Sequence, residues 1–496
     1  MVGLQRASIF AIKEEVTAGE YVKPDSGSQF VPLRPGNSLS FTAEQLESDE
    51  LLNDIGAAKS FVGKESSEGS HSAYLRHSGV EGQEPQLGVM FESVMGSKAV
   101  NGTEYTSQVG SNESAIVVTT PGNFYPGQAL LIKSGVGYQI RNVKEVDGSD
   151  IILNFLASNS DENLSLGKAI TYLPVPQGHP TFSATKYLGN GHAIEATSGN
   201  TVTELSLTAD ANGFGEVEFT YAGTKYFFNP IEINATNKYL DFVDENGTFA
   251  VSIAEKVYKT PIELCDALKA AMEAASPLEE FIVRYDKGVG TFTLATNTSS
   301  TFELLWDSGA NAANSIGDTL GFIVASDDTG ATNYVSDDSL DLESPIAPVY
   351  DSADAIIVKG AELFIGTSED DLCVCAQTVS LTISKEVEDV DCICEENGVK
   401  EKIAVSRSVE MSVTAVLNKH DATLLDALLK NSGISAMLNA GPKTGGNWIP
   451  GKCFNVYLSN CTVSSYTTTG DSFIQAEITL KGFVTSTQKD VYLNFV

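Results

Sequence analysis

The sequence predicts a mainly β protein that holds two copies of one β-sandwich unit, each with a flanking helix. A small all-β insert and an α+β insert complete the predicted fold. The first supporting observation is the run Ser406–Leu417, in which Glu410, Ser412 and Thr414 alternate with apolar residues. Successive side chains of a strand point to opposite faces, so this run is expected to be a half-buried antiparallel strand.

The second observation is an internal repeat, which has to be recognised before the fold is assigned. Glu68–Leu75 matches Glu410–Leu417 at four positions with an offset of 342, and Leu39–Thr42 resembles Val379–Thr382 with an offset of 340. Further on, Val217–Gly223 matches Ala476–Gly482 with an offset of 259. The offset falls from 342 to 259, so the first copy is expected to contain about 83 extra residues.

These matches divide the chain into four predicted parts. Residues 1–100 and 181–228 form the first β unit, and residues 346–496 form the second. Residues 101–180 form a small β domain, because short β runs alternate there with turn signals such as Pro121-Gly122 and Asp147-Gly148. Residues 229–345 form an α+β domain.

Two helices are predicted from their capping signals. Thr260, Pro261 and Glu263 mark the start of a helix that runs to about Ala275, with Thr260 as N-cap and Glu263 completing a capping box. Its apolar stripe is predicted to contain Ile262, Cys265, Leu268 and Met272. In the second β unit, a helix is expected over Asp421–Lys430. Leu87–Met95 is a candidate short helix that ends at Gly96.

The charge balance limits the possible functions. Among 496 residues, 65 acidic and 31 basic side chains give a net charge of −34. Ordinary nucleic-acid binding needs clustered Lys and Arg, so it is not expected, although a protein that passes nucleic acid without holding it fits this charge. The N-terminal residues contain no apolar run of signal-peptide or membrane-span length. We therefore expect folding in a cytoplasm, with the seven cysteines starting as thiols.

No strong catalytic motif is present. Asp307-Ser-Gly and Asp328-Thr-Gly resemble aspartic-protease signatures, but they lie only 21 residues apart and are better interpreted as acidic turns. The histidines lack metal-ligand spacing, and His71 is predicted to be a packed core residue. No enzyme activity and no cofactor are therefore expected.

The cysteines leave three alternatives open. Cys373 and Cys375, and again Cys392 and Cys394, place two thiols on one face of a strand. If the two segments pair, four sulfurs could bind zinc. Disulfides formed in the virion are a second alternative, and plain buried thiols are a third.

The repeated segments resemble the major tail tube proteins of long, non-contractile-tailed bacteriophages. The resemblance is found in Leu46–Leu51, Gly63–Ser70, Tyr74–Gly79 and Tyr187–Gly191, and it extends over residues 1–100, 181–228 and 346–496. It implies tail-tube-type β-sandwich units that stack as rings around a DNA channel. The two inserts would be exterior decoration modules.

The resemblance also implies partners and a location. A duplicated tube unit would form homotrimeric, pseudo-hexameric rings, and a tape measure protein and a tail terminator would be further partners. The protein would be assembled in the host bacterial cytoplasm and reside in the virion tail, without contact with a membrane. Another phage structural protein, such as a tail terminator or a decoration protein, is the alternative. A secreted carbohydrate-binding β protein fits less well, because a signal peptide is missing and only two Trp are present.

Two sets of residues are candidates for function. The polar faces of the repeated strands are predicted to line the channel, where an acidic surface would repel phosphate and let DNA slide: Glu68, Ser70, Glu216, Glu218, Glu410, Ser412, Glu477 and Thr479. The acidic stretches that follow the first repeated strand are candidates for contacts between subunits or rings: Glu47, Asp49, Glu50, Glu388, Asp389 and Asp391.

Overall fold

A computed structural model shows a mainly β chain that divides into two compact units. One unit comprises residues 1–9, 185–197 and 226–346, and the other comprises residues 10–184, 198–225 and 347–496. None of the helices in the described part of the chain is long and apolar enough to cross a lipid bilayer. The structure describes residues 7–48, 59–135, 137–157, 163–189, 191–297, 301–342, 344–366, 371–373, 375–416, 426, 430–469 and 474–496.

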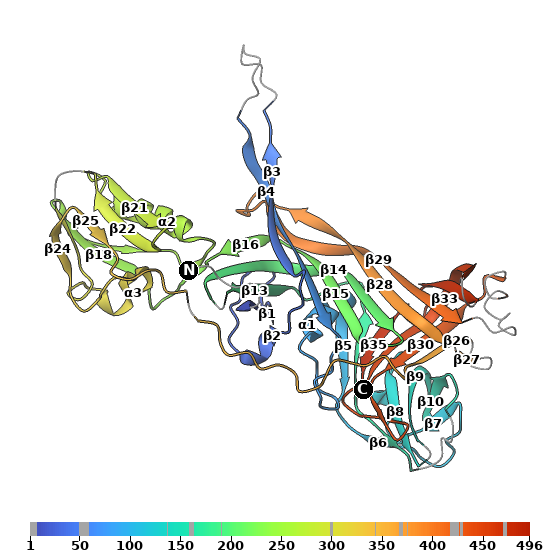
Figure 1. Cartoon of the computed structure of the whole chain (residues 1–496). Helices are drawn as coiled ribbons and strands as arrows, with labels where there is room; N and C mark the ends of the chain where they lie inside the picture. Colours follow the sequence, from blue (N-terminus) through green and yellow to red (C-terminus); the bar gives the residue numbers. More distant parts are fainter. Residues whose placement is uncertain are drawn as a thin grey trace. The chain divides into compact units, whose positions relative to one another are not determined.

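The larger unit is built on a run of eight antiparallel strands. Pairs of strands from distant parts of the chain lie side by side in this run, and β28 and β29 form a long hairpin (Figure 1). In order across the sheet, the strands are β3 (Ser38–Leu46), β4 (Phe61–Tyr74), β15 (Gly215–Gly223), β14 (Ala193–Asp210), β28 (Ala376–Asp391), β29 (Val399–Val416), β34 (Gln475–Gly482) and β33 (Phe454–Thr469).

The eight strands form two groups of four with the same register. We call β3, β4, β15 and β14 the first quartet, and β28, β29, β34 and β33 the second quartet. His71 lies opposite Phe219 in the first, and Val413 lies opposite Ile478 in the second, in agreement with the offsets of 342 and 259. The predicted offset of 340 for the first repeated strand is wrong by two residues, because Leu39 lies opposite Gly69 while Leu381 lies opposite Met411.

A β-bulge confirms the equivalence of the last strands of the quartets. The register of β14 shifts around Thr203, and the register of β33 shifts around Ser464. The Thr203 hydroxyl donates to the Thr220 carbonyl, and the Ser464 hydroxyl donates to the Thr479 carbonyl, each at 3.1 Å. A bulge adds one residue and increases the local twist, so the two quartets also share this distortion.

Further strands and a helix enclose the core of the larger unit. Helix α1 (Gly88–Met95) ends at Gly96, whose φ of 97° suits glycine, and its Met90, Phe91 and Val94 are buried. One hydrophobic cluster contains side chains from both quartets and from α1. The remaining strands are β1 (Ile9–Glu14), β2 (Phe30–Val31), β5 (Gly96–Asn101), β12 (Ala169–Pro174), β13 (Phe182–Leu188), β16 (Lys225–Phe228), β26 (Glu362–Gly366), β27 (Asp371–Cys373), β30 (Ile434–Ala440), β31 (Lys443–Thr444), β32 (Asn447–Trp448) and β35 (Tyr492–Phe495).

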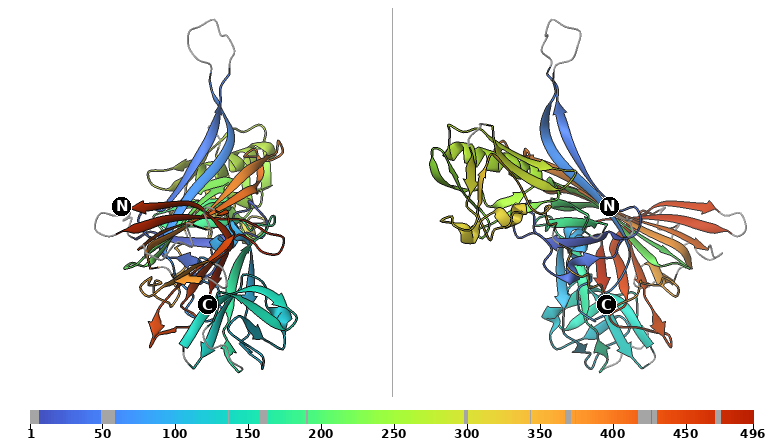
Figure 2. Two further views of the ribbon diagram at one scale, coloured as in Figure 1. Left: turned by 90° about the vertical axis from the view of Figure 1, so that its right-hand side faces the viewer. Right: turned by 60° about the vertical axis from the view of Figure 1, so that its left-hand side comes forward.

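The first insert is a six-stranded sheet attached to this unit by buried amides. In order, its strands are β6 (Tyr105–Thr106), β11 (Ser165–Leu166), β8 (Ala129–Ser134), β9 (Gly137–Asp147), β10 (Asp150–Asn154) and β7 (Ala115–Val117). The Asn142 amide donates to Asn455 at 2.9 Å, Asn455 donates to Asn439 at 2.7 Å, and Asn494 donates to Asn455 at 2.8 Å. All four side chains are fully buried, and the sheet lies beside the C-terminal strands in each view (Figure 2).

The second insert belongs to the smaller unit and has a core of its own. Thr260 caps helix α2 (Pro261–Ala275) as predicted, but the Glu263 carboxylate accepts from the backbone N–H of Lys259 rather than from Thr260. The predicted apolar stripe is wrong at Ile262, which is 61% exposed, whereas Leu264 is buried. The other elements are β17 (Ile231–Ile233), β18 (Tyr239–Asp244), β19 (Gly247–Ser252), β20 (Lys256–Tyr258), β21 (Phe281–Asp286), β22 (Thr291–Thr296), β23 (Phe302–Leu304), α3 (Gly317–Leu320), β24 (Asp328–Ala331) and β25 (Asn333–Val335).

The predicted helix over Asp421–Lys430 lies almost entirely outside the described residues. Asp426 and Lys430 are helical and form an ion pair of 2.6 Å at a spacing of four residues.

Candidate functional site: the polar face of the sheet

The two quartets present one continuous face of Ser, Thr and Glu side chains. Glu68, Glu218, Glu410 and Glu477 are exposed, and the inward neighbours Val217, Phe219, Val413, Ile478 and Leu480 are buried. Leu417, also predicted to be inward, lies outside the described residues. The structure therefore brings all the predicted polar-face residues together on one side of the sheet, which follows from the two-residue period of strands.

Cross-strand pairing aligns this face across the junction of the quartets. Along one row of the sheet, the successive residues are Ser72, Glu218, Ser206, Thr382, Glu410 and Lys481. Hydroxyl groups bond between neighbouring strands, such as Ser38 to Ser70 at 3.0 Å and Ser465 to Thr479 at 2.9 Å. The surface of this face therefore consists mainly of Ser and Thr hydroxyl groups, with Glu carboxylates between them.

The charge of this face is predominantly negative. Arg34 lies 2.8 Å from Glu216, which raises the pKa of the guanidinium, and Lys481 lies 4.0 Å from Glu410. The other carboxylates extend the negative charge over both quartets: Glu68, Glu204, Glu218 and Glu477. The sequence pattern did not indicate Glu204, Arg34 or Lys481 as charges of this face. The bulge at Thr203 interrupts the alternation that would have indicated Glu204.

The core side of the first quartet contains a histidine without polar contacts. His71 is fully buried and stacks on Phe10 with ring centroids 5.0 Å apart, as its core prediction requires. Neither ring nitrogen has a hydrogen-bond partner among the described residues. Burial lowers the pKa of His71 to about 3, so the ring is neutral at physiological pH.

The acidic stretches differ in their surroundings. Glu47 is exposed just beyond β3, while Asp49 and Glu50 lie outside the described residues. Asp389 and Asp391 lie within β28 rather than in a loop, and both contact Lys64 of β4, at 2.6 and 2.8 Å. Asp389 also binds Lys402 at 2.5 Å, whereas Glu388 is exposed. The end of the β28–β29 hairpin is therefore attached to the first quartet.

The cysteine pairs are separated by a whole strand. Cys375 precedes β28 and Cys392 follows it, and a strand of 16 residues spans roughly 50 Å. The four sulfurs therefore do not converge within one chain, and the described residues contain no group of three or more potential metal ligands. Cys375 and Cys394 are exposed, so the expectation of buried thiols is wrong for these two. The side chain of Cys373 lies outside the described residues.

Of the two aspartate motifs predicted to be acidic turns, Asp307 lies in a turn, but Asp328 begins strand β24, so the prediction is wrong there. The backbone N–H of Asp307 donates to Asp327 at 2.8 Å, and the Trp306 indole donates to Asp328 at 2.9 Å.

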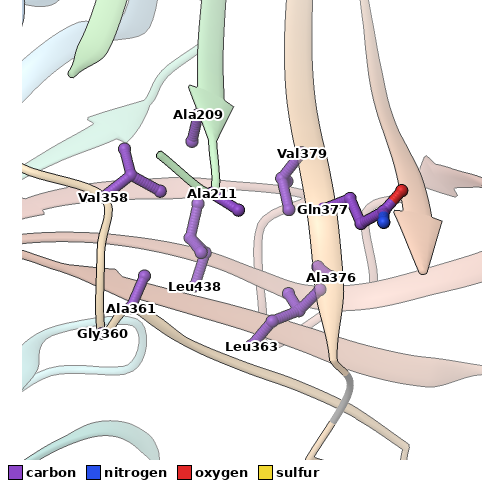
Figure 3. A pocket seen from close by; sticks show the side chains of 10 residues that line it. All are labelled: Ala209, Ala211, Val358, Gly360, Ala361, Leu363, Ala376, Gln377, Val379 and Leu438. Carbon is purple, nitrogen blue, oxygen red and sulfur yellow. The ribbon is translucent and has the colours of Figure 1, made fainter. Parts of the chain in front are cut away.

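A small hollow opens at the edge of the core between the quartets. Its volume is about 110 Å³, and Ala209, Val358, Leu363 and Leu438 are among its lining side chains (Figure 3). The side chain of Gln377 points away from it, and its amide oxygen accepts a hydrogen bond from the Gln475 amide. Apart from Gln377, the side chains that line it are apolar, so we treat the polar face as the candidate functional surface.

Comparison with known families identifies the chain. Residues 5–237 match the model of the family described as phage tail tube protein. This match supports a phage tail tube protein and covers just under half of the chain. The match includes the whole first quartet, and the shared register extends the likeness to the second quartet. No curated protein matches the chain. The tail tube family is structural, and its members assemble with other tail proteins into the tube of the virion.

Proposed function

We propose that this tail tube protein polymerises as stacked trimeric rings, with the polar face lining a channel for DNA. One observation supports this most strongly. In the two central strands of each quartet, four of the eight equivalent polar-face positions carry the same residue, while most core positions differ. The identical outward pairs are Glu68 and Glu410, Ser70 and Ser412, Glu218 and Glu477, and Thr220 and Thr479.

A sheet core can be filled by different apolar residues of similar total volume. A surface that serves only as a solvated exterior tolerates changes even more readily. The identity of these four outward pairs therefore supports a function of this face in both copies. A channel lining is such a function, because every repeat of the ring would present the same chemistry to the DNA.

The strand count fits a ring of three chains. Each chain contributes eight strands, so three chains give a barrel of 24. With strands about 4.8 Å apart and tilted by about 40°, the barrel has a backbone diameter of roughly 48 Å. That interior is wide enough for duplex DNA.

The charge of the face suits passage rather than binding. Phosphate contacts from Lys and Arg give proteins their affinity for DNA, and here Arg34 and Lys481 are already opposed by Glu216 and Glu410. Single charges are screened within about 8 Å at physiological salt. Stacked rings would repeat the carboxylates at intervals along the channel.

Charge reversal tests this assignment. The variant E68K/E218K/E410K/E477K is expected to assemble into tubes but to slow DNA ejection, with a new dependence on salt, because its lysines would bind phosphates. The matched control is E113K/E145K/E232K/E245K, which changes the net charge equally at exposed positions outside the quartets. Microscopy of tubes and time-resolved DNA release from virions measure the two effects.

If the first variant ejects DNA at the normal rate and salt dependence, these side chains do not line the channel. If the purified protein forms single rings that never stack, the alternative role as a tail terminator gains support.

A further inference from the structure

The two outer edges of the eight-stranded sheet are built to accept another strand. Among the described strands, β3 is paired only with β4, and residues 462–469 of β33 are paired only with β34. Natural sheets protect open edges with Lys or Pro. Neither residue occurs in residues 38–43 or 462–469, which are mostly Ser and Thr.

The chain already contains one seam between quartets, where β14 pairs with β28. Leu205 lies opposite Ile383 and Leu207 opposite Leu381, and all four side chains are essentially fully buried. On the polar side, Ser206 lies opposite Thr382. We call this pairing the internal seam.

The shared register relates each outer edge to one side of the internal seam. The first strand of the second quartet, β28, is equivalent to β3 at an offset of 342, so Ile383 corresponds to Phe41. The last strand of the first quartet, β14, is equivalent to β33 at an offset of 261, so Leu205 corresponds to Tyr466.

We propose that β33 of one copy pairs with β3 of the next in the register of the internal seam. This inference rests on the ring assembly proposed above. It places Ser465 opposite Thr42, Tyr466 opposite Phe41, Thr467 opposite Ser40, Thr468 opposite Leu39, and Thr469 opposite Ser38.

The side chains at these edges fit the pairing. Phe41 is 47% exposed in the single chain, and Tyr466 is partly exposed, whereas their counterparts Ile383 and Leu205 are buried in the internal seam. Pairing in this register places the two aromatic rings directly opposite each other on the core side, where such pairs stabilise a sheet. On the polar side it brings hydroxyls together, so no like charges meet although the chain carries a net charge of −34.

Disulfide trapping tests the register in assembled protein. We would introduce S40C/T467C into full-length chain with Cys375, Cys392 and Cys394 changed to serine, oxidise the assemblies, and map the cross-links by mass spectrometry. Residues directly opposite lie within disulfide reach, so covalent dimers and trimers are expected, ending at three chains. The matched positive control is S206C/T382C, which occupies the same position of the internal seam and should close within one chain.

Two register controls sharpen the test. S40C/S465C and S40C/T469C keep both thiols on the polar face but shift one by two residues, or roughly 7 Å. They should cross-link at least tenfold less than S40C/T467C. Preferential cross-linking of either shifted pair in assembled rings would overturn the register.

The remaining outcomes separate this inference from the proposed function. One outcome is that rings form and S206C/T382C cross-links normally, but none of the interchain pairs does. This result would show that the two edges do not meet. Absence of rings and tubes from the unsubstituted protein would refute ring assembly itself, and the seam with it.

Discussion

The two quartets have the same backbone register but fill their cores differently. In the first quartet, Gly69 lies opposite Tyr221 and His71 opposite Phe219. In the second, Met411 lies opposite Leu480 and Val413 opposite Ile478. Where the first quartet has a small residue beside a large one, Gly69 and Tyr221, the second has two residues of intermediate size, Met411 and Leu480. The difference shows that the core can be refilled by other apolar combinations, while four outward pairs, such as Glu68 and Glu410, stay identical.

Exchanging one core pair should have the largest effect. A Cβ added at Gly69 would lie 2.4 Å from the ring of Tyr221, which is fully buried. Gly69→Met is therefore expected to destabilise the protein by about 3 kcal/mol through overpacking. The double variant G69M/Y221L, which introduces the pair found in the second quartet, should recover most of that loss.

Denaturant unfolding of the two single variants and the double variant measures the coupling. The reverse exchange, M411G/L480Y, is the matched control in the second quartet. Additive losses in G69M/Y221L would show that the two pairs are not interchangeable.

Replacing His71 by the valine of the second quartet should remove a pH dependence. The folded pKa of His71 is about 3, while the unfolded histidine titrates near 6.5. Between these values only the unfolded chain binds the proton, so stability falls as pH falls from 6.5 towards 3. The slope is about 1.4 kcal/mol per pH unit.

Thermal melts of wild type and His71→Val between pH 4 and 8 test this expectation. The variant should lose stability less steeply below pH 6.5, and the two proteins should respond alike above pH 7. Parallel curves over the whole range would mean that His71 titrates alike in the folded and the unfolded chain.

The smallest effect is expected where the quartets contact each other through their hairpins. Lys64 lies between Asp389 and Asp391, and its side chain is 31% exposed. Lys64→Ala should cost about 1 kcal/mol or less, because partly exposed ion pairs contribute little. Hydrogen exchange should nevertheless increase at the end of the β28–β29 hairpin, around Asn397. Lys430→Ala, which removes the exposed pair with Asp426, is a control that should leave this hairpin unchanged.

Local periodicity was sufficient to predict the polar and core faces of β4, β15, β29 and β34. Their alternation is a property of each segment alone, and the repeat gave the correct offsets for these strands. Neither the local periodicity nor the repeat could predict the pairing of β14 with β28. About 170 residues separate these strands, and their local sequences do not specify a neighbour. The division into two tube units with two exterior inserts stays a prediction.

Other features escaped prediction for specific physical reasons. The two-residue error for β3 arises because a shift by two preserves both faces of a strand, so the alternation cannot detect it. Ile262 was assigned to the core of α2 from spacing, but it lies in the first turn, beside the solvent. The buried asparagines gave no signal, since polar residues are expected at the surface unless they find partners.

Because of those asparagines, the two inserts should differ in how easily recombination can replace them. The α+β insert has its own core cluster, so a recombination event between phages can replace it as a self-contained cassette. The six-stranded insert also has a core cluster of its own, but its Asn142 side chain and the backbone of Gly127, Ala129 and Ile140 bond to a group of three buried side chains, Asn439, Asn455 and Asn494. Its transfer without those three partners would leave buried amides unsatisfied, and each such group costs roughly 1–3 kcal/mol. We therefore expect the six-stranded insert to be inherited together with the C-terminal strands that it contacts.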